Sequence, residues 1–122
     1  MKGQVTLEYM TVSLVALVLL SLAVGSLYKI KEMSDSSYEL MGFKASAEKI
    51  HSTSKELCAM GDGNSREIDV KVPVEVEEYE DIIRYSNMDN SIIKESHCRM
   101  SMGVVEGRIT LKNKKGTIVA EN

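Results

Sequence analysis

The side chains best suited to metal or redox chemistry are two histidines and two cysteines, His51, Cys58, His97 and Cys98. Imidazole nitrogens and thiolates are the ligands that zinc prefers in proteins. His51 and Cys58 are seven residues apart and would share one face of a helix. Adjacent residues of a strand, such as His97 and Cys98, point to opposite sides. We therefore expect no metal site and no cofactor.

The even number of cysteines favours a disulfide instead, because the chain begins with an export-like segment. A bond between Cys58 and Cys98 would close a loop of about 40 residues and stabilise a small domain by ~3–4 kcal/mol. Two buried free thiols are the alternative.

Two acidic segments are candidates for cation binding. Asp62-Gly63-Asn64 resembles the opening of a calcium loop, but the later acidic ligands of that motif are missing, so a turn is expected. The acidic run from Glu75 to Asp81 is interpreted as a solvated edge, with a cation or partner patch as the alternative.

Several functional classes are disfavoured by the rest of the sequence. No nucleophile–base set and no phosphate-binding glycine loop is present, so we expect no enzymatic activity. The net charge is −3 and the basic residues are scattered, which argues against a nucleic-acid partner. The chain also contains no N-x-[ST] acceptor for N-glycosylation.

A long apolar segment near the start of the chain organises the other elements. No charged residue occurs from Tyr9 to Tyr28, and a helix of that length reaches ~30 Å, the thickness of the hydrocarbon core of a bilayer. The run is too long for a secretory signal peptide, and no small-residue cleavage site follows it. We assign residues 4–28 to a transmembrane or otherwise apolar-packed helix.

The helix is expected to continue to Met60, with residues 29–60 amphipathic. An apolar stripe with 3- and 4-residue spacing predicts one buried face, comprising Met33, Ser36, Leu40, Phe43, Ala47, Ile50, Ser54 and Leu57. Glycines from Gly61 onwards end the helix. A bend near Gly25, near Gly42 or at residues 34–37 is left open.

Residues 61–122 are expected to form a small antiparallel sheet packed on the helix stripe, which gives an α+β fold. Alternating apolar residues predict a strand over 68–76, where Pro73 indicates an edge strand or a bulge. Further strands are expected at 82–86, 91–94 and 98–102. A hairpin is predicted over 108–120.

The first residues resemble a known family. Lys2-Gly3-Gln4-Val5-Thr6-Leu7-Glu8-Tyr9 is similar to the class III signal peptide of archaeal type IV pilins, in which a glycine precedes the pattern Q-x-[ST]-x-E-[YF]. The stretch from Leu57 to Gly63 is also similar to small pilin-like proteins. The resemblance implies a pilin-like fold, with residues 1–3 as a leader that a prepilin peptidase removes by cutting between Gly3 and Gln4.

In this family the apolar helix stays on the mature protein and becomes the filament core. The resemblance therefore implies insertion in the archaeal plasma membrane, then assembly into an extracellular pilus by an assembly ATPase and a membrane platform. It also implies that Glu8 pairs with the amino terminus of Gln4 in a neighbouring subunit. We expect a structural subunit that supports surface adhesion, major or minor.

The alternative is an uncleaved, single-pass membrane anchor that displays the sheet domain outside the cell for binding or sensing. Lys2 is the one basic side chain before the apolar segment, whereas Lys29 and Lys31 follow it. The positive-inside rule therefore favours an orientation opposite to that of the pilins.

Overall fold

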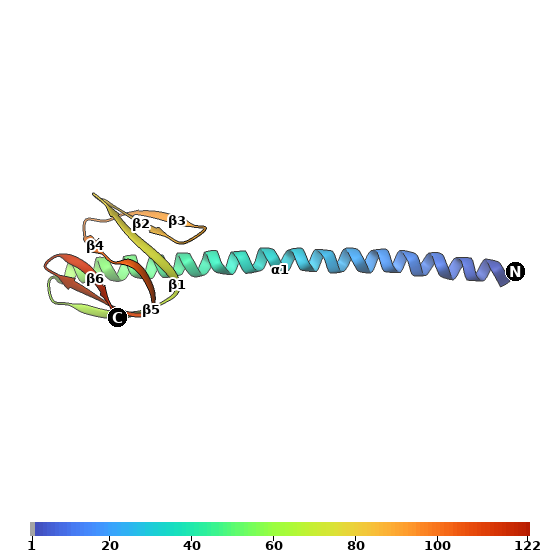
Figure 1. Cartoon of the computed structure of the whole chain (residues 1–122), viewed down its shortest axis with the longest axis horizontal. Coiled ribbons are helices and arrows are strands. Elements are labelled where there is room, and N and C mark those ends of the chain that lie inside the picture. The colour runs from blue at the N-terminus through green and yellow to red at the C-terminus, as the bar shows by residue number, and fades with distance from the viewer. Residues whose placement is uncertain (1) are drawn as a thin grey trace. The chain divides into compact units, whose positions relative to one another are not determined.

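The computed structural model describes residues 2–122, with side chains from Gly3 onwards. Met1, part of the expected leader, lies outside the described residues. One α-helix is followed by six strands (Figure 1): α1 (Lys2–Met60), β1 (Ser65–Tyr79), β2 (Ile82–Ser86), β3 (Ser91–Glu95), β4 (Arg99–Ser101), β5 (Gly103–Lys114) and β6 (Thr117–Glu121). The predicted α+β class, with a long N-terminal helix and a small sheet, is confirmed. The chain divides into two compact units, Met1–Ser37 and Tyr38–Asn122.

Helix α1 begins at Lys2, two residues before the expected start at residue 4, and ends at the expected Met60. Helical structure continues through Gly25, residues 34–37 and Gly42. At the C-terminus Gly61 has φ 90°, and its N–H donates to the carbonyl of Cys58 at 3.3 Å. The Asn64 side-chain amide donates to the carbonyls of Met60 and Gly61 at 3.0 and 3.1 Å. Glycine in the left-handed region and an amide donor together satisfy carbonyls that the helix leaves without a partner.

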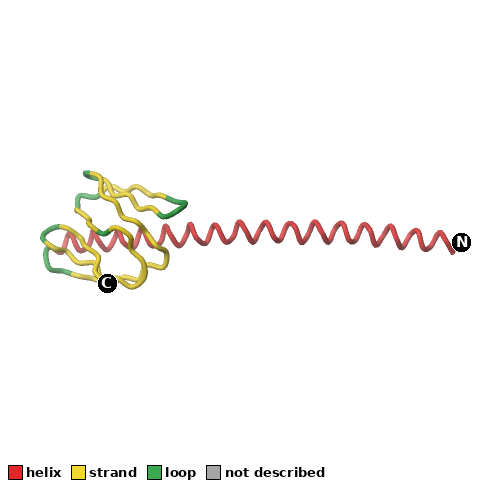
Figure 2. Tube along the Cα trace, viewed as in Figure 1, coloured by secondary structure: helices red, strands yellow, loops and turns green. Residues whose placement is uncertain are grey.

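The strands of the second unit, yellow in Figure 2, form one sheet. Their order in the sheet is β3-β2-β1-β5-β6-β4. Four of the five strand pairs are antiparallel, as expected, but β4 pairs with β6 in parallel. Strand β4 has three residues and comes directly after β3 in the chain. It is therefore not joined to its partner β6 by a hairpin turn, and the two strands can run parallel. The Met100 N–H of β4 donates to the Glu78 carboxylate of β1 at 3.0 Å, which occupies one backbone donor of this edge strand.

Strand β1 lies inside the sheet, so Pro73 is not on an edge strand. The pairing of β1 with β5 shifts between Val70 and Val74, and Pro73 lies inside this irregularity. Val70 pairs with Gly107 and Val74 with Val105, so three residues of β1 face a single residue of β5. The bulge alternative is the one found. It accommodates a residue that has no N–H to donate to the ladder.

The core of the second unit lies between α1 and one face of the sheet. Phe43, Ala47, Ile50 and Leu57 of the predicted stripe are buried, whereas Met33 and Ser36 in the first unit are exposed. The sheet contributes the other large buried side chains, namely Ile68, Val70, Val74, Val76, Ile83, Tyr85, Met100, Val105, Ile109, Leu111 and Ile118. The stripe is thus buried only where the sheet is available to cover it.

Within the second unit, α1 runs antiparallel alongside the first part of β1. Glu56 forms an ion pair with Arg66. One heptad earlier, Lys49 donates to the carbonyl of Asp69 at 3.4 Å. Gly42 lies another seven residues earlier, and a Cβ added there would lie 3.0 Å from the side chain of Val72. Glycine at this position therefore permits a close approach of α1 to β1. Seven helical residues rise ~10.5 Å and three strand residues ~10 Å, so the two elements remain in step.

Candidate functional site

The first unit is a helical segment whose apolar side chains are exposed on all sides. Large apolar residues from Val5 to Leu27 have exposed fractions between 53% for Val18 and 75% for Met10. An amphipathic helix would show one polar face and one apolar face. A helix that is apolar all round instead requires an apolar environment, either lipid or other helices.

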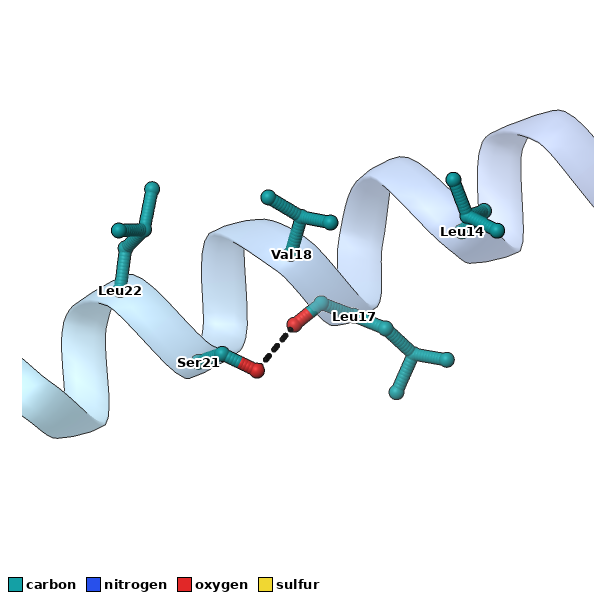
Figure 3. Close-up of a pocket in the computed structure, with 5 residues that line it drawn as sticks. All are labelled: Leu14, Leu17, Val18, Ser21 and Leu22. Carbon is teal, nitrogen blue, oxygen red and sulfur yellow. Dashed lines mark hydrogen bonds between the residues drawn. The ribbon is translucent and has the colours of Figure 1, made fainter.

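The hydroxyl groups of this segment bond to its own backbone. Ser21 donates to the carbonyl of Leu17 at 2.9 Å (Figure 3), and Ser26 donates to Leu22 at 2.8 Å. The hydroxyl of Thr11 lies 2.8 Å from the Glu8 carbonyl. Leu14, Leu17, Val18 and Leu22, together with Ser21, line an apolar hollow on the helix surface. Satisfied hydroxyls remove much of the penalty for placing polar atoms in hydrocarbon.

Gly3, Gln4 and Glu8 all lie in the exposed N-terminal turns of α1. No atom of the chain would lie within 4 Å of a Cβ added at Gly3. Among the described side chains Glu8 has no ion-pair partner. The carboxylate of Glu8 is one turn from Gln4 and faces outward, so it is free to interact with a group on another molecule.

The predicted disulfide between Cys58 and Cys98 is present, with a Cα–Cα distance of 6.2 Å. Cys58 lies in the last turn of α1, and Cys98 immediately precedes β4. The expected strand over 98–102 is therefore shorter than predicted, at Arg99–Ser101. The bond joins the end of the helix to the short edge strand of the sheet.

The other members of the four-residue set are separated. His97 is exposed, and the Nδ1 atom of His51 lies 3.0 Å from the hydroxyl of Tyr85. Among the described residues, no group of three or more His, Cys, Asp and Glu side chains is close enough together to hold a metal ion.

His51 and Tyr85 belong to a polar cluster at the helix–sheet interface of the second unit. The Tyr85 side chain is buried, its hydroxyl lies 3.7 Å from Sδ of Met100, and its ring meets that of His51 edge to face. Burial raises the pKa of Tyr85. Burial and the nearby Lys94 ammonium lower the pKa of His51. Lys94 also forms an ion pair with Glu48, and that hydrogen bond lowers the pKa of the Glu48 carboxyl.

The segment Asp62-Gly63-Asn64 forms the predicted turn, which is tied to the β5–β6 hairpin. The Asp62 carboxylate accepts from the Lys115 N–H at 2.7 Å, and the Gly63 N–H donates to the carbonyl of Asn113 at 2.9 Å. Asn113 is buried, and its side chain donates to the Leu57 carbonyl at 3.1 Å. In the sequence Asn113 is simply part of the hairpin predicted over 108–120, and no local pattern indicates its contact with the helix end.

The acidic run from Glu75 to Asp81 covers the end of β1 and the turn into β2. Four of its five carboxylates belong to exposed residues, and Glu77 is half-buried. Of these groups, Glu77 accepts from the Tyr79 hydroxyl at 3.2 Å and Glu78 from the Met100 N–H. None of them forms an ion pair within the part of the chain whose side chains are described.

Helix α1 is long and apolar enough to cross a membrane, judged by its length and composition. Comparison of the chain with protein-family models, with curated proteins and with solved structures found no match.

Proposed function

We propose that this chain is a structural subunit, a pilin or minor pilin-like protein, of an archaeal type IV pilus. A prepilin peptidase cuts between Gly3 and Gln4 while the precursor spans the archaeal plasma membrane once. An assembly ATPase and a membrane platform then move the mature subunit into an extracellular filament that supports surface adhesion. The proposed role is structural, with no catalytic activity.

The helical surface around residues 9–28 is the observation that carries the proposal. Its side chains are uncharged and exposed on every side, and the hydroxyls of Thr11, Ser21 and Ser26 bond to the helix backbone. Such a surface is compatible with lipid and equally with identical helices. A subunit that leaves the membrane for a filament core needs a helix that suits both environments.

Glu8 supports the filament role more than a simple anchor. An ionised carboxylate near the edge of the hydrocarbon costs roughly 2.5–3.5 kcal/mol on insertion scales. Cleavage after Gly3 creates a positively charged amine on Gln4, and that amine on a neighbouring subunit would pair with the unpartnered Glu8 carboxylate. The pair would define the axial register of adjacent helices.

A second candidate is an uncleaved single-pass anchor that displays the second unit outside the cell for binding or sensing. Lys29 and Lys31 follow the apolar segment, and the positive-inside rule disfavours the outside location of the second unit that both candidates require. The two candidates differ in whether residues 1–3 remain on the protein.

Intact-mass measurement of the chain isolated from native membranes distinguishes the candidates. The proposal predicts a mass lacking Met1 to Gly3, and a persistent uncleaved chain contradicts it. Gly3→Val is expected to block cleavage, whereas Gly25→Val is the matched control, because a Cβ at either glycine meets no atom within 4 Å. Glu8→Gln is expected to leave cleavage intact and reduce filament yield.

A further inference from the structure

The two edge strands of the sheet, β4 and β3, differ in how their surroundings use them. Next to β4, the disulfide ties Cys98 to the end of α1, and the Glu78 carboxylate accepts the N–H of Met100. Within residues 2–122, β3 pairs with β2 alone, and no printed hydrogen bond occupies its other side. The β3 edge is therefore the open edge of this sheet.

The hydrogen bonds at the ends of the β2–β3 hairpin identify the free backbone groups of this edge. At the turn, the Asn87 N–H donates to the Asn90 carbonyl at 2.9 Å, and at the other end the Ser96 N–H donates to the Asp81 carbonyl at 2.9 Å. In an antiparallel pair, hydrogen-bonded and non-hydrogen-bonded residue pairs alternate. The register of the hairpin then gives the residues whose N–H and C=O groups point away from β2, namely Ser91, Ile93 and Glu95.

The side chains of these three residues lie on the outer face of the sheet. Ser91, Ile93 and Glu95 are the exposed residues in the alternating burial pattern of β3, and Ile93 is 62% exposed. A charge on an edge strand normally discourages pairing with another chain. The Lys94 ammonium of β3, however, already forms an ion pair with Glu48 of α1. An apolar side chain amid free donors and acceptors makes this edge a template for a further strand.

A single antiparallel register of two β3 strands uses every free group. With Ile93 facing Ile93 of a second copy, Ser91 faces Glu95 in both directions, and the outward N–H and C=O groups of all three residues are paired. A shift by one residue places outward groups opposite groups already bonded to β2. A shift by two residues loses a pair and brings Lys94 opposite Lys94, or Asp89 towards Glu95. Like charges directly opposite each other are destabilising.

We propose that β3 of one copy of this chain pairs with β3 of a second copy about a two-fold axis at Ile93, which joins the two sheets into one. The contact is isologous, because the same strand serves both copies. The self-complementary row of donors, acceptors and side chains identifies the second copy as the partner. A contact between two five-residue strands is small, so one pair binds weakly, but repeated pairs along filaments add to one another.

The two-fold axis also determines the relative direction of the two copies. Neighbouring antiparallel strands of one sheet are related by an axis perpendicular to that sheet. The part of α1 that packs on the sheet face lies across this axis, so it runs in the opposite direction in the second copy. Copies that project from one membrane share a direction, and the contact therefore joins copies from two facing surfaces. Here the inference rests on the proposed function, since it makes the adhesion a contact between filaments.

Amide hydrogen exchange of the full-length chain in detergent micelles tests the pairing, at about 0.05 mM and about 1 mM protein, a range suited to a weak contact. The amides of Ser91, Ile93 and Glu95 are expected to exchange about tenfold more slowly at the higher concentration. Ile92 and Lys94 should be protected at both concentrations, because they bond to β2. Exchange of the three outward amides that does not change with concentration overturns the proposal.

Nuclear Overhauser contacts between copies identify the partner strand and its register. In a mixture of 13C-labelled and unlabelled chains, isotope filtering selects contacts between copies. The proposal predicts a contact between the Hα atoms of Ile92 in one copy and Lys94 in the other, since these residues form the closely spaced non-hydrogen-bonded pairs. A contact between the two Ile92 residues or between the two Lys94 residues reveals a shifted register and overturns the proposal.

Variants at the two-fold axis provide the controls. Ile93→Pro removes an outward N–H without removing a bond to β2, and edge strands accept proline at such a position. It is expected to abolish both the concentration dependence and the contacts between copies. Ile93→Glu should do the same by placing two carboxylates face to face, without changing the backbone. Ile93→Val keeps the N–H and the branched side chain and is expected to pair. Equal pairing by all of these proteins contradicts the proposal.

The outcomes separate this inference from the proposed function. A chain that is cleaved after Gly3 and forms filaments, but whose β3 amides show no dependence on concentration, refutes the contact and leaves the pilin assignment intact. An uncleaved chain that still gives the contact between Ile92 and Lys94 refutes the pilin assignment and leaves the pairing intact.

Discussion

Reduction of the Cys58–Cys98 disulfide is expected to remove a large part of the stability of the second unit. The bond closes a loop with a sequence separation of 40. In the chain-entropy model a loop of that size restricts the unfolded chain by about 4 kcal/mol at 25 °C. Small domains have total stabilities of only about 5–15 kcal/mol. The reduced protein is therefore expected to remain folded in the cold and to unfold readily on warming.

Amide hydrogen exchange of the full-length chain in detergent micelles measures this effect without interference from the apolar helix. The slowest amides of β1 and β5 report the global unfolding free energy. They should lose about 4 kcal/mol of protection when the disulfide is reduced. The amides of Arg99–Ser101 should lose more protection than those of β5, because β4 has only three register pairs with β6.

The double variant C58A/C98A is the control, since it mimics the reduced state without leaving thiols. It should match the reduced protein, and its exchange should not respond to reductant. A difference between oxidised and reduced protein below about 1 kcal/mol would refute the reasoning, because the loop-closure model gives about 4 kcal/mol.

Three further predictions concern the interface between α1 and the sheet. Tyr85→Phe removes the hydroxyl that lies 3.0 Å from Nδ1 of His51, and should destabilise the unit by about 1–2 kcal/mol in urea unfolding. Burial and Lys94 lower the pKa of His51, so its neutral form is favoured in the fold. Stability is therefore complete above the unfolded pKa of about 6.5 and falls as the pH drops towards the folded pKa. Unfolding at a series of pH values should lose this dependence between pH 5 and 7 in His51→Gln. Ser54 is fully buried and its hydroxyl has no partner among the described residues, so Ser54→Ala should raise the melting temperature, whereas a decrease would imply an unseen hydrogen bond.

The parts of the fold that could be predicted from the sequence depend on local or periodic signals. The apolar run and the 3–4 spacing predicted one helix that ends at Met60, where Gly61 takes positive φ. The expected strands over 82–86 and 91–94 correspond to β2 and β3, and the hairpin predicted over 108–120 corresponds to β5 and β6. The disulfide could be anticipated because the chain has only two cysteines. Each of these inferences uses neighbouring residues or simple counting.

Contacts between distant segments could not be read in the same way. The parallel pairing of β4 with β6 depends on how the chain returns to the sheet edge after β3, and three residues carry no signal of strand direction. The burial of Asn113 depends on the Leu57 carbonyl, 56 residues earlier in the chain. Gly3, Gln4 and Glu8 are the reverse case, since their pattern is visible in the sequence and the proposed cleavage after Gly3 would leave no mark on the fold.

The matched spacing of α1 and β1 limits which changes in chain length the second unit tolerates. Inserting one residue between Lys49 and Glu56 would rotate the following helix by about 100° and turn Glu56 away from Arg66. Seven inserted residues would restore the rotation of the helix, but the three strand residues of matching length would exchange the inward and outward side chains of β1. Related sequences that keep this arrangement should therefore vary in length outside residues 42–72 and preserve the number of residues within each of the two elements.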